Sequence, residues 1–198
     1  MISFSDLKKG VFVLIGKQPY EILQARPLFK GRGHSVLQTK LRNLITGNLI
    51  SKTFHPSDTF EEVALEKLPA KFLYAHRGEY WFQKIENGQR FNLKELQLGE
   101  QKNFLKPSQI VRALVFNQKV INISLPIKIC FKVTEAPPGI KAGRAEPGTK
   151  QVTLETGAKL NVPLFVEKGD LVEVNTQTGQ YIRRVKKEPT KGLLNEGQ

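Results

Sequence analysis

Short apolar runs separated by glycine-containing turns recur along the whole chain. In residues 127–134 an apolar side chain stands at every second position, which is typical of a strand with one buried face. We expect only a helical turn at residues 6–10 and one short helix over 93–99. The predicted strands cover residues 11–15, 20–28, 36–45, 49–54, 71–74, 80–84, 110–116, 120–125, 127–134, 152–156, 159–165, 171–175 and 181–185.

This pattern predicts an all-β chain folded as three small β-barrels, each close to the lower size limit of a domain. Acidic residues near position 62 mark the first boundary, and Pro126 opens the third segment. The second and third segments suit the five-stranded oligonucleotide-binding (OB) barrel. The predicted domains are residues 1–63, 64–127 and 128–187, and residues 188–198 are predicted to form a disordered tail.

The chain is strongly basic, with a formal net charge of +13 over 198 residues. Each predicted domain carries about the same excess of Lys and Arg, so a single basic tail does not explain the charge. Basic charge of this size points to nucleic acid or to an anionic membrane surface. We expect an extended contact with RNA or DNA whose affinity falls steeply with salt.

A single cysteine, Cys130, excludes an internal disulfide and favours an intracellular protein. The first residues lack the pattern of a signal peptide. No apolar run approaches the ~20 residues of a membrane-spanning helix. We therefore expect a cytoplasmic protein with no membrane partner.

The sequence holds no recognisable catalytic motif. There is no Walker-type phosphate loop, and one Cys with three scattered His cannot supply a metal site. We predict no catalytic residue, no metal and no cofactor, and hence that the protein is not an enzyme. A hydrolase or transferase remains an alternative, which a deep pocket with clustered titratable groups would favour.

The segment between the predicted strands 20–28 and 36–45 is the strongest candidate site. It holds Arg32 between two glycines, which tolerate positive φ and can form a tight hairpin tip. One long cation then stands at the apex, although an ordinary solvated turn is the alternative. The residues expected to support the tip are Lys30, Gly31, Gly33 and His34.

The sequence around this loop is one-sided in charge. Residues 22–57 contain no Asp or Glu but six Lys or Arg. In the returning strand, Gln38, Lys40 and Arg42 share one face by the two-residue period. A solvated face normally mixes both signs, so this one suits a polyanion.

Two further places are candidate RNA contacts. A long loop between two proline-containing turns carries Lys141 and Arg144. Tyr181 begins the last predicted strand with arginines close behind, and an exposed tyrosine there can stack on a base. A core position is the alternative for Tyr181, and the aromatic run 80–82 is interpreted chiefly as packing.

Several motifs together resemble a known family. They are Lys40-Leu41-Arg42-Asn43-Leu44-Ile45-Thr46-Gly47, Lys52-Thr53-Phe54, Lys150, Thr153-Leu154-Glu155-Thr156-Gly157-Ala158, Val162-Pro163-Leu164-Phe165, Gly169-Asp170, Asn175-Thr176-Gln177-Thr178-Gly179 and Tyr181. With these spacings, the chain resembles bacterial elongation factor P over about residues 1–187.

The resemblance implies an L-shaped molecule, with an SH3-like, KOW-type first barrel followed by two OB barrels. It implies a monomeric translation factor that binds the ribosome between the P and E sites and contacts peptidyl-tRNA. Such a factor stimulates peptide-bond formation where consecutive prolines stall synthesis. The resemblance places the tip residue of the first domain, which reaches toward the acceptor end of that tRNA, at Arg32.

Many members of the family have Lys at the tip position, and a subgroup with Arg receives a rhamnose from an arginine rhamnosyltransferase. Arg32 is similar to that subgroup, but Gly33 stands where the subgroup has Asn. An unmodified Arg32 therefore remains an alternative to a modified one.

A second departure lies in residues 139–146, which lack the Asp and Thr that the family uses for exit-site contacts. Arg144 in this loop favours phosphate contact. Val152 also replaces an expected Ala, so an elongation factor P-like paralogue remains an alternative, as does a structural RNA-binding protein of the ribosome. The predicted RNA-binding residues are Lys40, Arg42, Lys141, Arg144, Lys150, Tyr181 and Arg184, the last two matching the family's Tyr and Arg.

Overall fold

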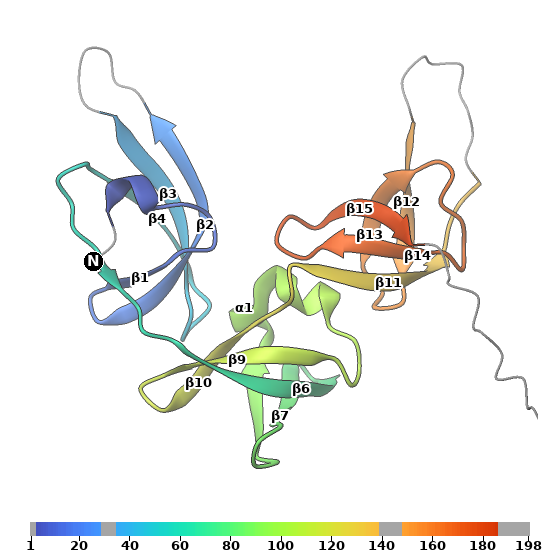
Figure 1. The fold of residues 1–198 in the computed structure, drawn as a ribbon, viewed down its shortest axis with the longest axis horizontal. Helices are drawn as coiled ribbons and strands as arrows, with labels where there is room; N and C mark the ends of the chain where they lie inside the picture. Colours follow the sequence, from blue (N-terminus) through green and yellow to red (C-terminus); the bar gives the residue numbers. More distant parts are fainter. Residues whose placement is uncertain (1–2, 29–34, 139–147, 186–198) are drawn as a thin grey trace, which may run out of the picture. The chain divides into compact units, whose positions relative to one another are not determined.

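The computed structural model describes residues 3–28, 35–138 and 148–185 (Figure 1). The chain divides into two compact units at Leu125 and Pro126. The first unit holds two five-stranded sheets and the second unit holds a third. The expectation of an all-β chain built from three small barrels is confirmed.

The first sheet has the strand order β4-β3-β2-β1-β5, and the strand pairs are antiparallel. A short 3-10 helix, η1 (Phe4–Asp6), precedes it, close to the helical turn expected at residues 6–10. Alternation sends one face of strands β1 to β4 into a core of Val13, Ile22, Leu37, Leu41 and Phe54, which Leu7 and Phe60 complete. The strands are β1 (Phe12–Ile15), β2 (Gln18–Leu28), β3 (Val36–Asn43), β4 (Leu49–Phe54) and β5 (Glu61–Glu62).

The second sheet forms the central barrel, with the order β10-β9-β6-β7-β8. Its core includes Phe72, Phe82, Leu93, Leu98 and Val111. The elements are β6 (Glu66–His76), β7 (Glu79–Lys84), β8 (Arg90–Lys94), the helices α1 (Glu95–Leu98) and η2 (Gly99–Phe104), β9 (Ile110–Phe116) and β10 (Lys119–Ser124).

The third sheet has the order β13-β12-β11-β14-β15. Counted within their own sheets, the central and third sheets have the same strand order, and in both the third strand also contacts the fifth. Such closure is the expected topology of a five-stranded barrel. The strands are β11 (Lys128–Glu135), β12 (Thr149–Leu154), β13 (Lys159–Pro163), β14 (Leu171–Asn175) and β15 (Gln180–Val185).

The central barrel contains strand residues that the apolar pattern did not predict. Strand β8 was missed because only two of its side chains, Phe91 and Leu93, point inward. The first residues of β6 were missed for the same reason, since Leu68 and Ala70 are the only apolar inward-facing residues there and stand among Glu66, Lys67 and Pro69. The helix expected over 93–99 is confirmed as a helical segment, but it begins at Glu95 and continues as η2.

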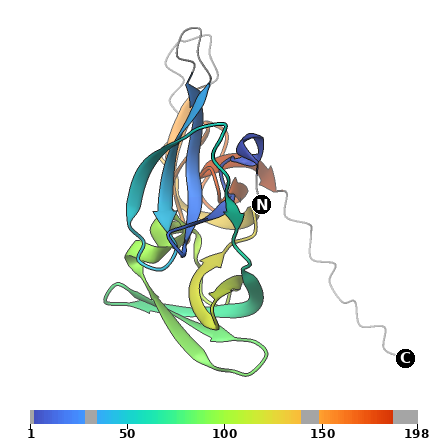
Figure 2. The same cartoon turned by 90° about the vertical axis from the view of Figure 1, so that its left-hand side faces the viewer.

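Within the first unit, the first sheet packs directly on the central barrel. A buried apolar cluster joins Leu44 of the first sheet's β3–β4 turn to Leu114 and Ile121 of the central barrel. The Gln97 amide donates to the carbonyl oxygens of Ile45 at 2.9 Å and Ile121 at 3.2 Å, which ties both parts to α1. Both views show β2 and β3 running away from this contact, so their far ends lie distant from α1 (Figures 1 and 2).

Candidate nucleic-acid interface

The longest ladder of the first sheet leads to the candidate loop. Strands β2 and β3 stay paired as far as Leu28 opposite Val36. This confirms that the two strands predicted on either side of the loop are antiparallel partners. The tip residue Arg32 lies outside the described residues. So do the support residues Lys30, Gly31, Gly33 and His34, and their roles stay predictions.

The outer face of this ladder is open and basic. Lys40 is exposed and stands opposite Gln24 on one side and Ser51 on the other. Arg26 is also exposed, opposite Gln38. None of the described residues directly opposite these two cations is acidic, so this part of the face can approach an anionic backbone.

The expectation that Arg42 continues this exposed face is wrong. Its side chain points to the same side as that of Lys40, as the two-residue period predicts. At this end of β3, however, the central barrel covers the outer face, and Arg42 is only 9% exposed. Its Nη1 donates to the carbonyl oxygen of Leu98 at 3.4 Å. Arg42 therefore holds two barrels together and offers little surface to RNA.

A carboxylate accompanies this buried arginine. Glu21 on β2 stands directly opposite Arg42 on β3. Burial raises the pKa of Glu21 above its ordinary value, while the charges of Arg42 and Lys9 act in the opposite direction. The domain contact thus contains a carboxyl group that is costly to ionise, beside the cation that offsets part of this cost.

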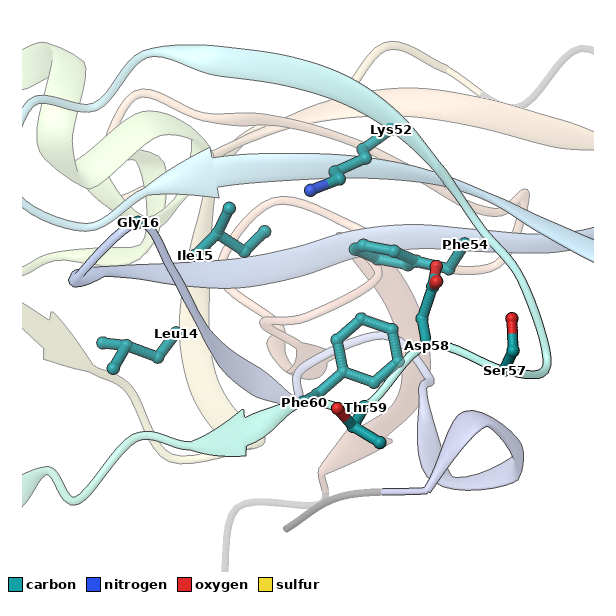
Figure 3. A pocket seen from close by; sticks show the side chains of 9 residues that line it. All are labelled: Leu14, Ile15, Gly16, Lys52, Phe54, Ser57, Asp58, Thr59 and Phe60. Carbon is teal, nitrogen blue, oxygen red and sulfur yellow. The ribbon is translucent and has the colours of Figure 1, made fainter.

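Lys52 lies on the opposite side of the first sheet, with its Nζ 5.7 Å from the centre of the Phe54 ring. It lines a pocket of about 550 Å³, with Ser57 and Asp58 among the polar lining residues (Figure 3). Phe54 and Phe60 line the bottom of this pocket and contact each other edge to face, with 4.6 Å between the ring centres. Both rings are almost fully buried, so the pocket offers a ligand mainly its polar rim.

The candidate residues of the second unit are in part already engaged by the protein. The Nζ of Lys150 donates to the carbonyl oxygen of Pro137 at 2.9 Å. Arg184 pairs with Asp170 at 3.3 Å, and its Cζ lies 5.2 Å from the centre of the Phe165 ring. Tyr181 is partly exposed. Lys141 and Arg144 fall outside the described residues.

One exposed aromatic pair, Tyr74 and Trp81, was not predicted from the sequence. Strict alternation would put Tyr74 on the same face as the core residue Phe72. A bulge between Phe72 and Tyr74 changes the register, and Tyr74 stands opposite Trp81 on the outer face of the central sheet. Trp81 could have been found from the sequence, because its neighbours Tyr80 and Phe82 both pack inward.

Among the described residues, no group of three or more His, Cys, Asp or Glu is placed to hold a metal ion. In the same part of the chain, no helix combines the length and the apolar character needed to span a membrane.

Three family models match the chain in succession. Residues 3–60 match the KOW-like domain of elongation factor P, and residues 65–123 match its OB domain. Residues 129–184 match the C-terminal domain of elongation factor P. The expected SH3-like, KOW-type first barrel and the OB architecture are confirmed by these matches and the sheet topologies.

Curated relatives agree over nearly the whole chain. The elongation factor P of Desulfotalea psychrophila is 41% identical and covers 94% of this chain and 100% of its own. Those of Desulfatibacillum aliphaticivorans and Natranaerobius thermophilus are 37% and 36% identical, over 94% and 95% of this chain and 100% of their own. These relatives are translation elongation factors, a non-catalytic class of protein.

Proposed function

The chain belongs to the bacterial elongation factor P family, and on that premise we propose that it assists peptide-bond formation where consecutive prolines stall the ribosome. Family membership makes it a translation elongation factor and implies an interaction with the ribosome. In our proposal the cytoplasmic monomer binds between the P and E sites and contacts the peptidyl-tRNA. The ribosome performs the reaction, and no side chain of the factor acts as acid, base or nucleophile.

The β2–β3 ladder carries the proposal. It stays paired to Leu28 and Val36, so Arg32 lies within a short connection at the end of a long antiparallel ladder. The outer face of the same ladder presents Lys40 and Arg26 to solvent. Lys40 and Arg26 can contact an RNA backbone along this face, while Arg32 at the end of the ladder reaches beyond it.

The contact with the central barrel gives the ladder a fixed direction. Arg42 and Gln97 bridge the two barrels, so the first sheet is held by the body of the first unit. Proline is a slow acceptor partly because the reacting ends are poorly placed. Holding the end of the tRNA in a reactive geometry lowers the entropic part of the barrier, by up to about 7 kcal/mol when alignment is good.

Phosphate contacts then hold the factor on tRNA and ribosomal RNA. We assign these contacts to exposed or partly exposed side chains spread over both units. Arg42 is excluded because of its burial. The residues assigned to RNA contact are Lys40, Lys141, Arg144, Lys150, Tyr181 and Arg184.

The test is translation of a message that encodes Pro-Pro-Pro by purified ribosomes, with and without the factor. We expect the factor to restore synthesis through the prolines and to leave a matched message without prolines unchanged. Equal rates with and without the factor would contradict the proposal and favour the paralogue. A structural protein of the ribosome would instead remain bound at one copy per ribosome after a high-salt wash.

Whether Arg32 carries a rhamnose added by an arginine rhamnosyltransferase is tested by mass. Protein purified from its native source should be compared with protein made in a host that lacks the transferase. A mass difference confined to the peptide 29–35 would show a modified tip. Identical masses would assign the activity to the unmodified guanidinium.

A further inference from the structure

The outer face of the central sheet carries an aromatic pair in an exposed position. Phe72 and Phe82 face each other inside the barrel, whereas the next pair, Tyr74 and Trp81, points outward. The rings of Tyr74 and Trp81 lie 6.4 Å apart between centres, with 25° between their planes. Tyr74 is 48% exposed. One broad aromatic ring is thus held in place by a second and is open to solvent.

Basic side chains surround this pair on the same face. Lys71 and Arg90 both stand opposite Gln83, on either side of β7. Lys94 is the last residue of β8, directly before α1. Arg112 on β9 stands opposite Pro69 on β6. Within the described residues, none of these four cations forms an ion pair.

Acidic side chains are sparse at this surface. Glu79 stands opposite Lys94 at the edge of the sheet, and Glu95 lies near the β6–β7 turn but pairs with Lys102. An aromatic ring among unpaired cations matches a ligand that has both π faces and negative charge. Single-stranded nucleic acid has both, because each base can stack while its phosphate is held by Lys or Arg.

The position in the barrel supports the same ligand. Counted within the central barrel, Trp81 lies on the second strand and Asn92 opposite it on the third. OB barrels use the face of these two strands to bind oligonucleotides. The third sheet has the same strand order, but its first and second strands pair Glu135 with Thr153 on the outer face, and its second and third strands pair Gln151 with Asn161, so neither pair is aromatic. The two barrels therefore differ in ligand-binding character.

We infer that the outer face of the central barrel is a second RNA site, which binds an unstacked nucleotide. The ring of Tyr74 stacks on the base, supported by Trp81, and Arg90 and Lys71 contact the flanking phosphates. This site rests on the proposed function only for the choice of RNA over DNA. It lies on a different barrel from the Arg32 loop and assigns the central domain its own contact.

Trp81 provides the measurement, because it is the only tryptophan of the chain. The full-length protein is titrated at low salt with a short single-stranded oligoadenylate while the tryptophan fluorescence is recorded. We expect saturable quenching by the oligoadenylate and little quenching by an abasic oligomer of equal length. Equal quenching by both probes would overturn the inference, because charge alone would then explain binding. Polyglutamate that displaces the oligoadenylate as well as abundant unlabelled oligoadenylate does would also overturn the inference.

Variants locate the site. Tyr74→Ala should weaken oligoadenylate binding about tenfold or more, the usual loss for one stacked base. Arg90→Gln should reduce the slope of log affinity against log salt by about one. Lys128→Gln, an exposed lysine on the outer face of the third sheet, is the matched control and should leave the quenching unchanged. An effect of Lys128→Gln equal to that of Tyr74→Ala would overturn the inference.

Failure of this site can be told apart from failure of the proposed function. Thermal melting first confirms that Tyr74→Ala folds, and anisotropy of labelled oligoadenylate with Trp81→Phe gives a readout independent of tryptophan. If Arg32→Ala loses proline relief but keeps the quenching, both proposals stand. If the protein relieves proline stalls but its tryptophan is not quenched, only the second RNA site is wrong.

Discussion

Arg42 and Gly99 fit together so closely that a Cβ built on Gly99 would lie 2.5 Å from the Nη1 of Arg42. Arg42 comes from the first sheet, and Gly99 follows α1 of the central barrel. Gly99 also has a φ of +55°, which favours glycine. The orientation of the first barrel therefore depends on an arginine that can lie in this place only because its neighbour has no side chain.

We expect Gly99→Ala to lower the free energy of unfolding of the first unit by about 2–4 kcal/mol. Backbone strain contributes about 1–3 kcal/mol, and displacement of the guanidinium from the Leu98 carbonyl adds to it. Denaturant unfolding followed by Trp81 fluorescence measures the loss. The same substitution in an Arg42→Ala background should cost less, because the clash is gone. Strictly additive losses would show that the two residues do not interact.

Gly47 makes the second close approach between the barrels. A Cβ there would lie 2.5 Å from the backbone carbon and oxygen of Leu96, and neither atom can move by rotating a side chain. Gly16 is the matched control in the same unit, since its φ is also positive but a Cβ would meet nothing within 4 Å. Gly47→Ala should cost about 2 kcal/mol more than Gly16→Ala. Equal losses would argue against a tight contact at the β3–β4 turn.

Glu21 should make the stability of the first unit depend on pH. Burial raises its pKa in the folded state, so the folded protein retains a proton that the unfolded chain has already lost. The parent therefore loses stability as pH rises from the unfolded pKa, about 4.3, through the raised folded pKa. Glu21→Gln removes this dependence, so its stability relative to the parent should improve with rising pH over that window. A constant difference between pH 4 and pH 8 would contradict the burial of this carboxyl.

Lys40 and Lys52 lie on nearby strands of the first sheet but face opposite sides. Lys40→Gln should weaken ribosome binding and reduce the slope of log affinity against log salt by about one, because one phosphate contact is lost. Lys52→Gln should leave the slope unchanged, since that side chain lies over Phe54. Binding is followed by co-sedimentation with ribosomes over a range of salt. A larger loss of affinity from Lys52→Gln than from Lys40→Gln would place the RNA-facing surface on the side of Lys52 and contradict this prediction.

The sequence predicted the strands well wherever apolar residues alternate, because a half-buried strand leaves that pattern directly in the chain. It also placed Arg42 correctly on the side of Lys40. The burial of Arg42 could not be predicted. A second barrel covers one end of that face, and alternation within a strand carries no information about docking between barrels. The raised pKa of Glu21 was missed for the same reason.

The central barrel shows a different limit. Tyr74 is two residues from Phe72 and by period should share its side, but the bulge between them reverses it. A bulge adds one residue to one strand, and its position depends on the partner strand rather than on the local sequence. The place of Tyr74 on the aromatic face could therefore be recognised only from the paired strands.

Translation of a message that encodes Pro-Pro-Pro by ribosomes with Arg32→Ala or with the parent, with ribosome affinity measured in parallel, tests whether Arg32 positions the tRNA. Arg77→Ala is the matched control, because Arg77 is likewise followed by a glycine in the sequence and lies in the turn between β6 and β7. We predict that Arg32→Ala keeps its affinity within about threefold, since one tip contact is a small part of an extended phosphate interface. We also predict that it loses relief of the stall, while Arg77→Ala retains both. Synthesis through the prolines at the parental rate with Arg32→Ala would contradict the proposal that this guanidinium positions the tRNA.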